Sequence, residues 1–167
     1  MSESYNAQDS RERIGGVSVP MQNAINRIVD EHIGELDNVI DRIKSMLRDD
    51  TDILTDQEIE DILLHLPMLL YDVTDDQEIV GMQSDLAGLI YKESYNEALK
   101  IARGTVQEKT SASELATMTE KFDGVIYDRA YKIIKQKISM AVEVLNAVKR
   151  IHSTRVQGVE IGNKTNF

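Results

Sequence analysis

Apolar residues recur along this chain at spacings of three and four, the period of an α-helix with one buried face. The first run follows Met21 and consists of Val29, Ile33, Leu36, Ile40, Ile43 and Leu47. The segment before it is polar, contains a glycine pair and ends at Pro20. We therefore predict a mobile N-terminal arm over residues 1–20 and a first helix that ends within RDDTDILTD.

Capping signals predict the next two helices. Thr55 stands three residues before Glu58, the spacing of a capping box in which hydroxyl and carboxylate each satisfy a backbone N–H of the first turn. The apolar run that follows contains Pro67, where we expect a bend or a break. The tetrapeptide DQEI recurs just after Asp75, so the same capping is predicted to start another helix, which ends at Gly104 as a left-handed cap.

The last helical pattern is the longest. Ser111 and Glu114 have capping-box spacing, and the apolar stripe after them extends to about His152. About 40 residues span roughly 60 Å, and helices of that length usually bury their stripe against another chain or a long partner helix. We therefore predict an oligomer interface made of Ile126, Ile134, Ile138, Ala141, Leu145 and Val148. Residues 153–167 are polar and predicted to form a flexible tail.

These elements predict an all-α fold of about four helices with one long C-terminal helix, arranged as a helical bundle or coiled-coil oligomer. The helices are assigned to a single domain over residues 21–152, since a chain of 167 residues suits one domain. Only 5% of the residues are aromatic, so the core is expected to be aliphatic.

The absence of cysteine excludes disulfides, zinc–cysteine sites and thiol catalysis. No apolar run approaches the ~20 residues that cross a bilayer, and the start of the chain lacks the apolar segment of a signal peptide. We therefore expect a soluble, cytoplasmic protein with no membrane partner.

Metal, phosphate and acid–base sites are not supported. An EF-hand loop needs a glycine and regularly spaced oxygen ligands, but DDTDILTDQEIE lacks the glycine and has Leu54 at a ligand position. GVEIGNKT departs from a phosphate-binding loop at Asn163. The three histidines stand far apart: His32, His65 and His152. We expect no metal, no cofactor and no enzymatic activity.

Charge is distributed unevenly. The net charge is −10, yet residues 51–90 carry ten acidic and no basic side chains, whereas residues 129–155 carry seven basic side chains and one glutamate, 7 − 1 = +6. On a helical projection the basic residues opposite the apolar stripe are Arg129, Lys132, Lys135, Lys149 and Arg150. Lys137 points towards the apolar side and is expected to pair with an acid across an interface.

Three interpretations of this basic face remain open: an ordinary solvated surface, a contact with nucleic acid, and a contact with the acidic region of a neighbouring chain. Two tyrosine pairs at i,i+4, Tyr91 with Tyr95 and Tyr127 with Tyr131, could stack on bases. Packing along the helix flanks is the favoured interpretation of both pairs.

The order of three segments resembles a known group of proteins. They are LPMLLYDV, then YKESYNEALKIARGTVQEK, then VIYDRAYKIIKQKISMAVEVLNAVKRIHSTR. Over about residues 55–156 the chain resembles small helical proteins of tailed-phage recombination and replication gene clusters, and more distantly the UvsY-like recombination mediators.

The resemblance implies a non-catalytic accessory protein of a phage-infected bacterial cell. Such mediators form rings through a C-terminal helix, bind single-stranded DNA and help to load a recombinase against the single-strand-binding protein. The resemblance implies DNA contacts near the connector, at Lys92, Lys100, Arg103 and Lys109. An acidic helical scaffold or virion-assembly protein, and a small inhibitor of a host enzyme, are the alternatives.

Overall fold

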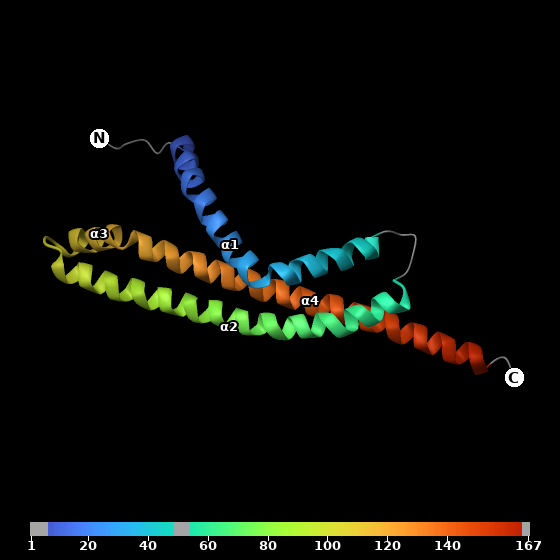
Figure 1. Cartoon of the computed structure of the whole chain (residues 1–167). Coiled ribbons are helices and arrows are strands. Elements are labelled where there is room, and N and C mark those ends of the chain that lie inside the picture. Colours follow the sequence, from blue (N-terminus) through green and yellow to red (C-terminus); the bar gives the residue numbers. More distant parts are fainter. Residues whose placement is uncertain (1–6, 49–53, 165–167) are drawn as a thin grey trace. The chain divides into compact units, whose positions relative to one another are not determined.

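The computed structural model describes residues 7–48 and 54–164, with the side chains of residues 15–46 and 54–157. In this part of the chain every regular element is a helix, in the order α1 (Ala7–Arg48), α2 (Asp56–Ile101), α3 (Val106–Ala116) and α4 (Met118–Lys164) (Figure 1). The all-α fold predicted from the apolar spacing is therefore confirmed.

The helix α2 replaces two predicted helices. It runs without interruption through Pro67 and Thr74, where the sequence predicted a break and a new start. Pro67 removes one backbone hydrogen bond, but the buried side chains of Leu66 and Leu70 hold this part of α2 in the core. Thr74 caps no helix, because its hydroxyl donates to the carbonyl oxygen of Leu70 at 2.7 Å within α2.

The predicted C-terminal helix is divided at Thr117, between α3 and α4. The backbone at Thr117 has φ −112° and ψ 20°, and its N–H and hydroxyl both donate to the carbonyl oxygen of Ser113, at 3.1 and 2.8 Å. Ser111, predicted to cap this helix, lies inside α3. The predicted number of helices is thus right although these boundaries are wrong.

Helix also covers residues 7–20 and 153–164, which the sequence assigned to the arm and the tail. Helix formation is cooperative, so a helix can propagate through a glycine at a cost of about 1 kcal/mol. Residues 1–6 and 165–167 lie outside the described residues. The mobility of both ends and the single domain over residues 21–152 stay predictions.

The chain divides into two compact units. The first unit comprises residues up to Glu31 together with Ile79–Lys132, and the second comprises His32–Glu78 together with the residues from Ile133 onwards. The helices α1, α2 and α4 each contribute a segment to both units.

The second unit contains most of the buried apolar residues. One cluster joins Leu54, Ile59 and Val148, with Met46 from α1 and Ile151 from α4 packed against it. The other buried apolar residues of this unit are Ile33, Leu36, Ile40, Ile43, Leu66, Leu70, Val73, Ile134, Ala141 and Leu145. Three helical segments therefore bury their stripes against one another, as predicted for an aliphatic core.

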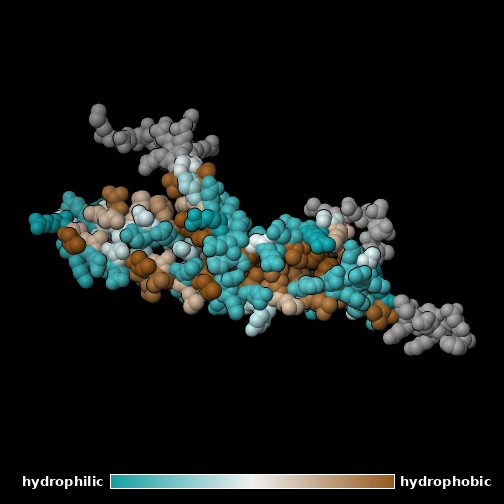
Figure 2. Space-filling model, viewed as in Figure 1, coloured by the Kyte–Doolittle hydropathy of each residue, from teal (hydrophilic) through white to brown (hydrophobic). Residues whose placement is uncertain are grey.

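The first unit has a much sparser core. Its buried apolar residues, among those described, are Ile25, Val29, Val80 and Ala130. Between Val80 and Ala130 the only buried residues are two polar ones, which are Ser113 and Thr117. Figure 2 shows brown apolar surface interrupting the teal polar surface of the molecule. Many apolar side chains of this unit therefore remain exposed.

Candidate nucleic-acid interface on α4

The helix α4 separates apolar from basic residues. Its buried positions in the second unit are Ile134, Ala141, Leu145 and Val148. These positions recur at helical spacing and share one face, so the residues between them point outwards. The basic residues that point outwards and are exposed are Arg129, Lys132, Lys135, Lys149 and Arg150. We call these five residues the basic face.

The buried stripe contains most of the residues that the sequence assigned to an oligomer interface. Of the six residues assigned to an oligomer interface, four are buried in the chain itself, and Ile126 and Ile138 are half-buried. Val148 contacts the cluster of Leu54 and Ile59 in the second unit. The chain's own helices therefore cover most of this stripe, and Ile126 and Ile138 keep part of their surface exposed. Oligomerisation itself stays a prediction.

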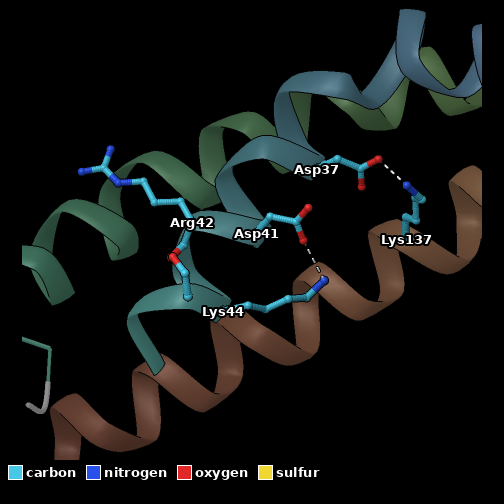
Figure 3. Close-up of polar contacts among 6 residues, drawn as sticks. Asp37, Asp41, Arg42, Lys44 and Lys137 are labelled. Atoms are coloured by element: carbon cyan, nitrogen blue, oxygen red, sulfur yellow. Dashed lines mark hydrogen bonds and ion pairs between the residues drawn. The ribbon is translucent and has the colours of Figure 1, made fainter. Parts of the chain in front are cut away.

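Ion pairs reduce the basic charge that α4 presents. Lys137 donates to a carboxylate oxygen of Asp37 on α1, which Figure 3 shows as two side chains pointing towards each other. The Arg155 Nη1 atom lies 2.8 Å from Asp56 Oδ1 at the start of α2. The expected pairing of Lys137 with an acid thus occurs within the chain, and the acidic region meets the basic helix at Arg155.

Within the basic face one residue is paired. Lys132 Nζ lies 2.7 Å from Asp128 Oδ2, one turn earlier on α4. The other four, which are Arg129, Lys135, Lys149 and Arg150, make no ion pair with the described residues. These side chains are therefore available for an anionic partner.

The residues that the resemblance placed at the connector lie in the first unit. Lys92 and Lys100 are exposed on α2, Arg103 is exposed after its end, and Lys109 is half-buried on α3. Gly104 has φ +114°, so the predicted positive φ is confirmed. A residue with a Cβ atom would be strained at this φ, so the turn requires glycine.

This turn contains a capping box that the sequence analysis missed. The hydroxyl of Thr105 accepts from the Glu108 N–H at 3.4 Å, and the Glu108 carboxylate accepts from the Thr105 N–H at 2.7 Å. The signal, a threonine three residues before a glutamate, was present in GTVQEKT. The hydrogen bonds from the Thr105 backbone and hydroxyl lower the pKa of Glu108 from its ordinary value.

The predicted box at the start of α2 is confirmed. The Thr55 N–H donates to the Glu58 carboxylate at 2.8 Å, and the Glu58 N–H donates to the Thr55 hydroxyl at 3.3 Å. The backbone and hydroxyl hydrogen bonds of Thr55 lower the pKa of Glu58. Both boxes order helix starts.

The tyrosines pack against the protein. The rings of Tyr91 and Tyr95 lie 6.1 Å apart between centroids and are tilted by 42°, a contact within α2. Tyr131 packs over Gly81, where a Cβ atom would lie 3.2 Å from its ring. Tyr91, Tyr95, Tyr127 and Tyr131 are all half-buried. These contacts agree with the packing interpretation of the pairs.

Other classes of site find no support in the described residues. No group of three or more His, Asp or Glu side chains there is placed to hold a metal ion. None of the described helices combines the length and the apolar character that a membrane span needs. Comparisons of the chain with protein-family models, with curated proteins and with solved structures found no match.

Proposed function

We propose that the protein is a non-catalytic accessory protein of phage recombination or replication that binds single-stranded DNA through the basic face of α4. One observation carries the proposal: α4 buries its apolar stripe within the chain while five basic side chains remain exposed on the same helix. The resemblance to recombination mediators supports the class of partner, which includes a recombinase and a single-strand-binding protein.

The mechanism is electrostatic. Lys135 and Arg150, both in the second unit, are separated by about 20 Å along α4 at 1.5 Å per residue, so this part of the face can follow a strand over several phosphates. Each phosphate that a basic side chain neutralises releases counterions, and log K for single strands then falls by about 0.7 per contact with log salt. The four residues without an ion pair would give a slope of about 2.8. Weak contacts per chain add through avidity if several chains bind one strand.

Binding of labelled oligo-dT at two salt concentrations tests the proposal. We expect binding at low salt that weakens steeply as salt rises. The variant Lys132→Glu/Lys135→Glu should lose this binding. The matched control is Arg42→Glu/Lys44→Glu on α1, which makes the same change in net charge at exposed positions and should bind nearly as the wild type does.

Two outcomes would refute DNA binding by this face. One is the absence of binding at low salt, even at concentrations where the protein is oligomeric. The other is equal loss of binding in the two double variants, because the effect would then follow the net charge of the protein and not the basic face.

An acidic helical scaffold or virion-assembly protein is the second candidate. The exposed apolar residues of α2, such as Met82 and Leu89, favour it because surfaces of this kind mark protein contacts. A scaffold would assemble without binding oligo-dT, so the same titration separates the two functions.

A further inference from the structure

A hollow of about 370 Å³ lies between α1 and α2 in the second unit. The buried side chains of Ile43 and Leu66 line it. Val39, Met46 and Ile62 line it as well and are half-buried, so each of them presents apolar surface to the outside. We call this hollow the α1–α2 groove. Its volume and its apolar lining are those of a binding site.

The groove opens on the side of α1 and α2 that faces away from α4. Two ion pairs attach these helices to α4, Asp37 with Lys137 and Asp56 with Arg155, and none of the four residues lines the groove. Figure 3 shows the side chain of Arg42, which does line it, pointing away from α4. The second unit therefore consists of three helical segments with an open groove between two of them.

The groove has room for about three turns of a helix. Along α1 its lining extends from Glu35 to Met46, 46 − 35 = 11 residue steps or roughly 16 Å at 1.5 Å per residue. Apolar grooves of this kind bind amphipathic helices, whose anchors recur at spacings of three and four. A helix bound here would complete a four-helix bundle.

The charged residues that line the groove are mainly acidic. Glu35 from α1 and Glu58 and Asp61 from α2 accompany one arginine, Arg42, so their net charge is 1 − 3 = −2 with histidine neutral. Hydrogen bonds from the Thr55 backbone and hydroxyl lower the pKa of Glu58 and keep it ionised. Glu35 and Asp61 are exposed and form no ion pair with the described residues. Each wall thus offers a carboxylate to a basic group.

We propose that the α1–α2 groove binds an amphipathic helix of a partner protein, with apolar anchors in the groove and lysine or arginine beside Glu35 and Asp61. Charge complementarity identifies this occupant. The same carboxylates repel nucleic acid and repel the acidic residues 51–90 of a second copy. The α4 helix of a second copy is basic, but it buries most of its apolar stripe in its own chain.

Two synthetic peptides of about 18 residues, long enough to form a helix, test the site. Both carry leucine at helical spacings of three and four, and the flanking positions are lysine in one peptide and glutamate in the other. Each is labelled with fluorescein and titrated with the full chain, and its fluorescence anisotropy is measured. We expect the lysine peptide to bind and the glutamate peptide to bind at least about tenfold more weakly.

Charge variants test whether the groove is the site of binding. Glu35→Lys/Asp61→Lys, at exposed positions, should weaken binding of the lysine peptide at least about tenfold. The matched control is Glu60→Lys/Glu78→Lys, which makes the same change in net charge. Glu60 and Glu78 are exposed and lie on the opposite side of α2 in a helical projection. The control should bind within about twofold of the wild type, because solvent and salt screen distant charges.

A bulky side chain tests the apolar contact. Val39→Trp should fill part of the groove and weaken binding of the lysine peptide at least about fivefold, with unchanged helical circular dichroism. The matched control is Leu64→Trp, because Leu64 is 65% exposed and lies outside the groove. This variant should bind as the wild type does.

Four results would overturn the proposal. They are no binding of the lysine peptide at about 100 µM protein, equal binding of the two peptides, equal loss in the two charge variants, and no effect of Val39→Trp. Sedimentation velocity tests the remaining occupant: self-association that Glu35→Lys/Asp61→Lys abolishes would assign the groove to a second copy and refute a basic partner.

The groove and the basic face can fail separately, because they lie on different helices. Lys132→Glu/Lys135→Glu should bind the lysine peptide as the wild type does. Glu35→Lys/Asp61→Lys should lose the peptide and still bind oligo-dT. A wild type that binds no oligo-dT would therefore leave the groove proposal standing.

Discussion

Lys137 on α4 forms an ion pair with Asp37 on α1, and the two side chains are 37% and 28% exposed. Figure 3 shows this pair close to a second one, Lys44 with Asp41, which lies within α1 and is separated by 3.1 Å. The first pair joins two helices of the second unit, whereas the second pair links neighbouring turns of one helix. The two pairs therefore differ in what they hold together.

A double-mutant cycle should measure that difference. For Asp37→Asn and Lys137→Met we expect a coupling energy of about 0.5–1 kcal/mol, because solvent screens a pair that is one-third exposed. For Asp41→Asn and Lys44→Met we expect about 0.3 kcal/mol, the usual value for a pair on one helix surface. Urea unfolding of the four proteins of each cycle gives both coupling energies. If the coupling of Asp37 with Lys137 were no larger than that of Asp41 with Lys44, the ion pair would not help to hold α1 against α4.

The start of α3 should depend on Thr105. Replacing this residue with alanine removes the acceptor of the Glu108 N–H, and we expect a loss of about 1 kcal/mol in the free energy of unfolding. Ser111→Ala is the matched control, because Ser111 lies inside α3 and alanine is the better helix former there. Urea denaturation measures both, and a larger loss at Ser111 would show that the helix starts where the sequence predicted.

The two capping boxes should make stability depend on pH. Hydrogen bonds from Thr55 and Thr105 lower the pKa values of Glu58 and Glu108 in the folded chain. The unfolded chain therefore binds protons first, so the stabilisation is complete above the ordinary glutamate pKa of about 4.3 and is lost as the pH falls through the lowered values.

Glutamine at either position should flatten this dependence. We expect the urea midpoint of Glu58→Gln or Glu108→Gln to fall less than that of the wild type between about pH 6 and about pH 3. Glu114→Gln serves as the control, because Glu114 is exposed on α3 and its side chain makes no hydrogen bond with the described residues. A control that flattens the curve as much as Glu108→Gln would refute the role of the boxes.

The capping signals show why the sequence predicted that these segments are helical but not where each helix begins. The spacing of Thr55 and Glu58 is repeated at Ser111 and Glu114, but only the first pair forms a box. A capping box needs a chain that enters from outside a helix. Gly104, with its positive φ, provides such an entry for Thr105, whereas Ser111 is preceded by helix. Gly104, directly before Thr105, was the signal that distinguished Thr105 from Ser111.

The apolar stripe of α4 shows how much of the candidate site could be predicted from the sequence. Periodicity identified Ile134, Ala141 and Leu145 as one apolar face, and all three are buried. The same periodicity placed Arg129 and Lys135 on the opposite, exposed face. Periodicity defines which face is apolar but not which chain covers it, so the covering by α1 and α2 emerged only from the structure.

The contact of Gly81 with Tyr131 gives a last prediction. Alanine in place of glycine inside a helix adds about 1 kcal/mol to stability where there is room for the methyl group. At Gly124 nothing lies within 4 Å of the added Cβ, so Gly124→Ala should show this gain. At Gly81 the Cβ would lie 3.2 Å from the Tyr131 ring, which must move. We expect Gly81→Ala to be less stable than Gly124→Ala by about 1 kcal/mol.

A second background separates packing from helix propensity. When Tyr131 is replaced with alanine the ring is absent, and Gly81→Ala should then gain as much stability as Gly124→Ala does. Thermal or urea unfolding of the four Gly81 and Tyr131 combinations measures this coupling. Gly81→Ala would contradict this explanation if it remained less stable than Gly124→Ala in the absence of the ring. The loss would then come from the backbone of α2 and not from contact with Tyr131.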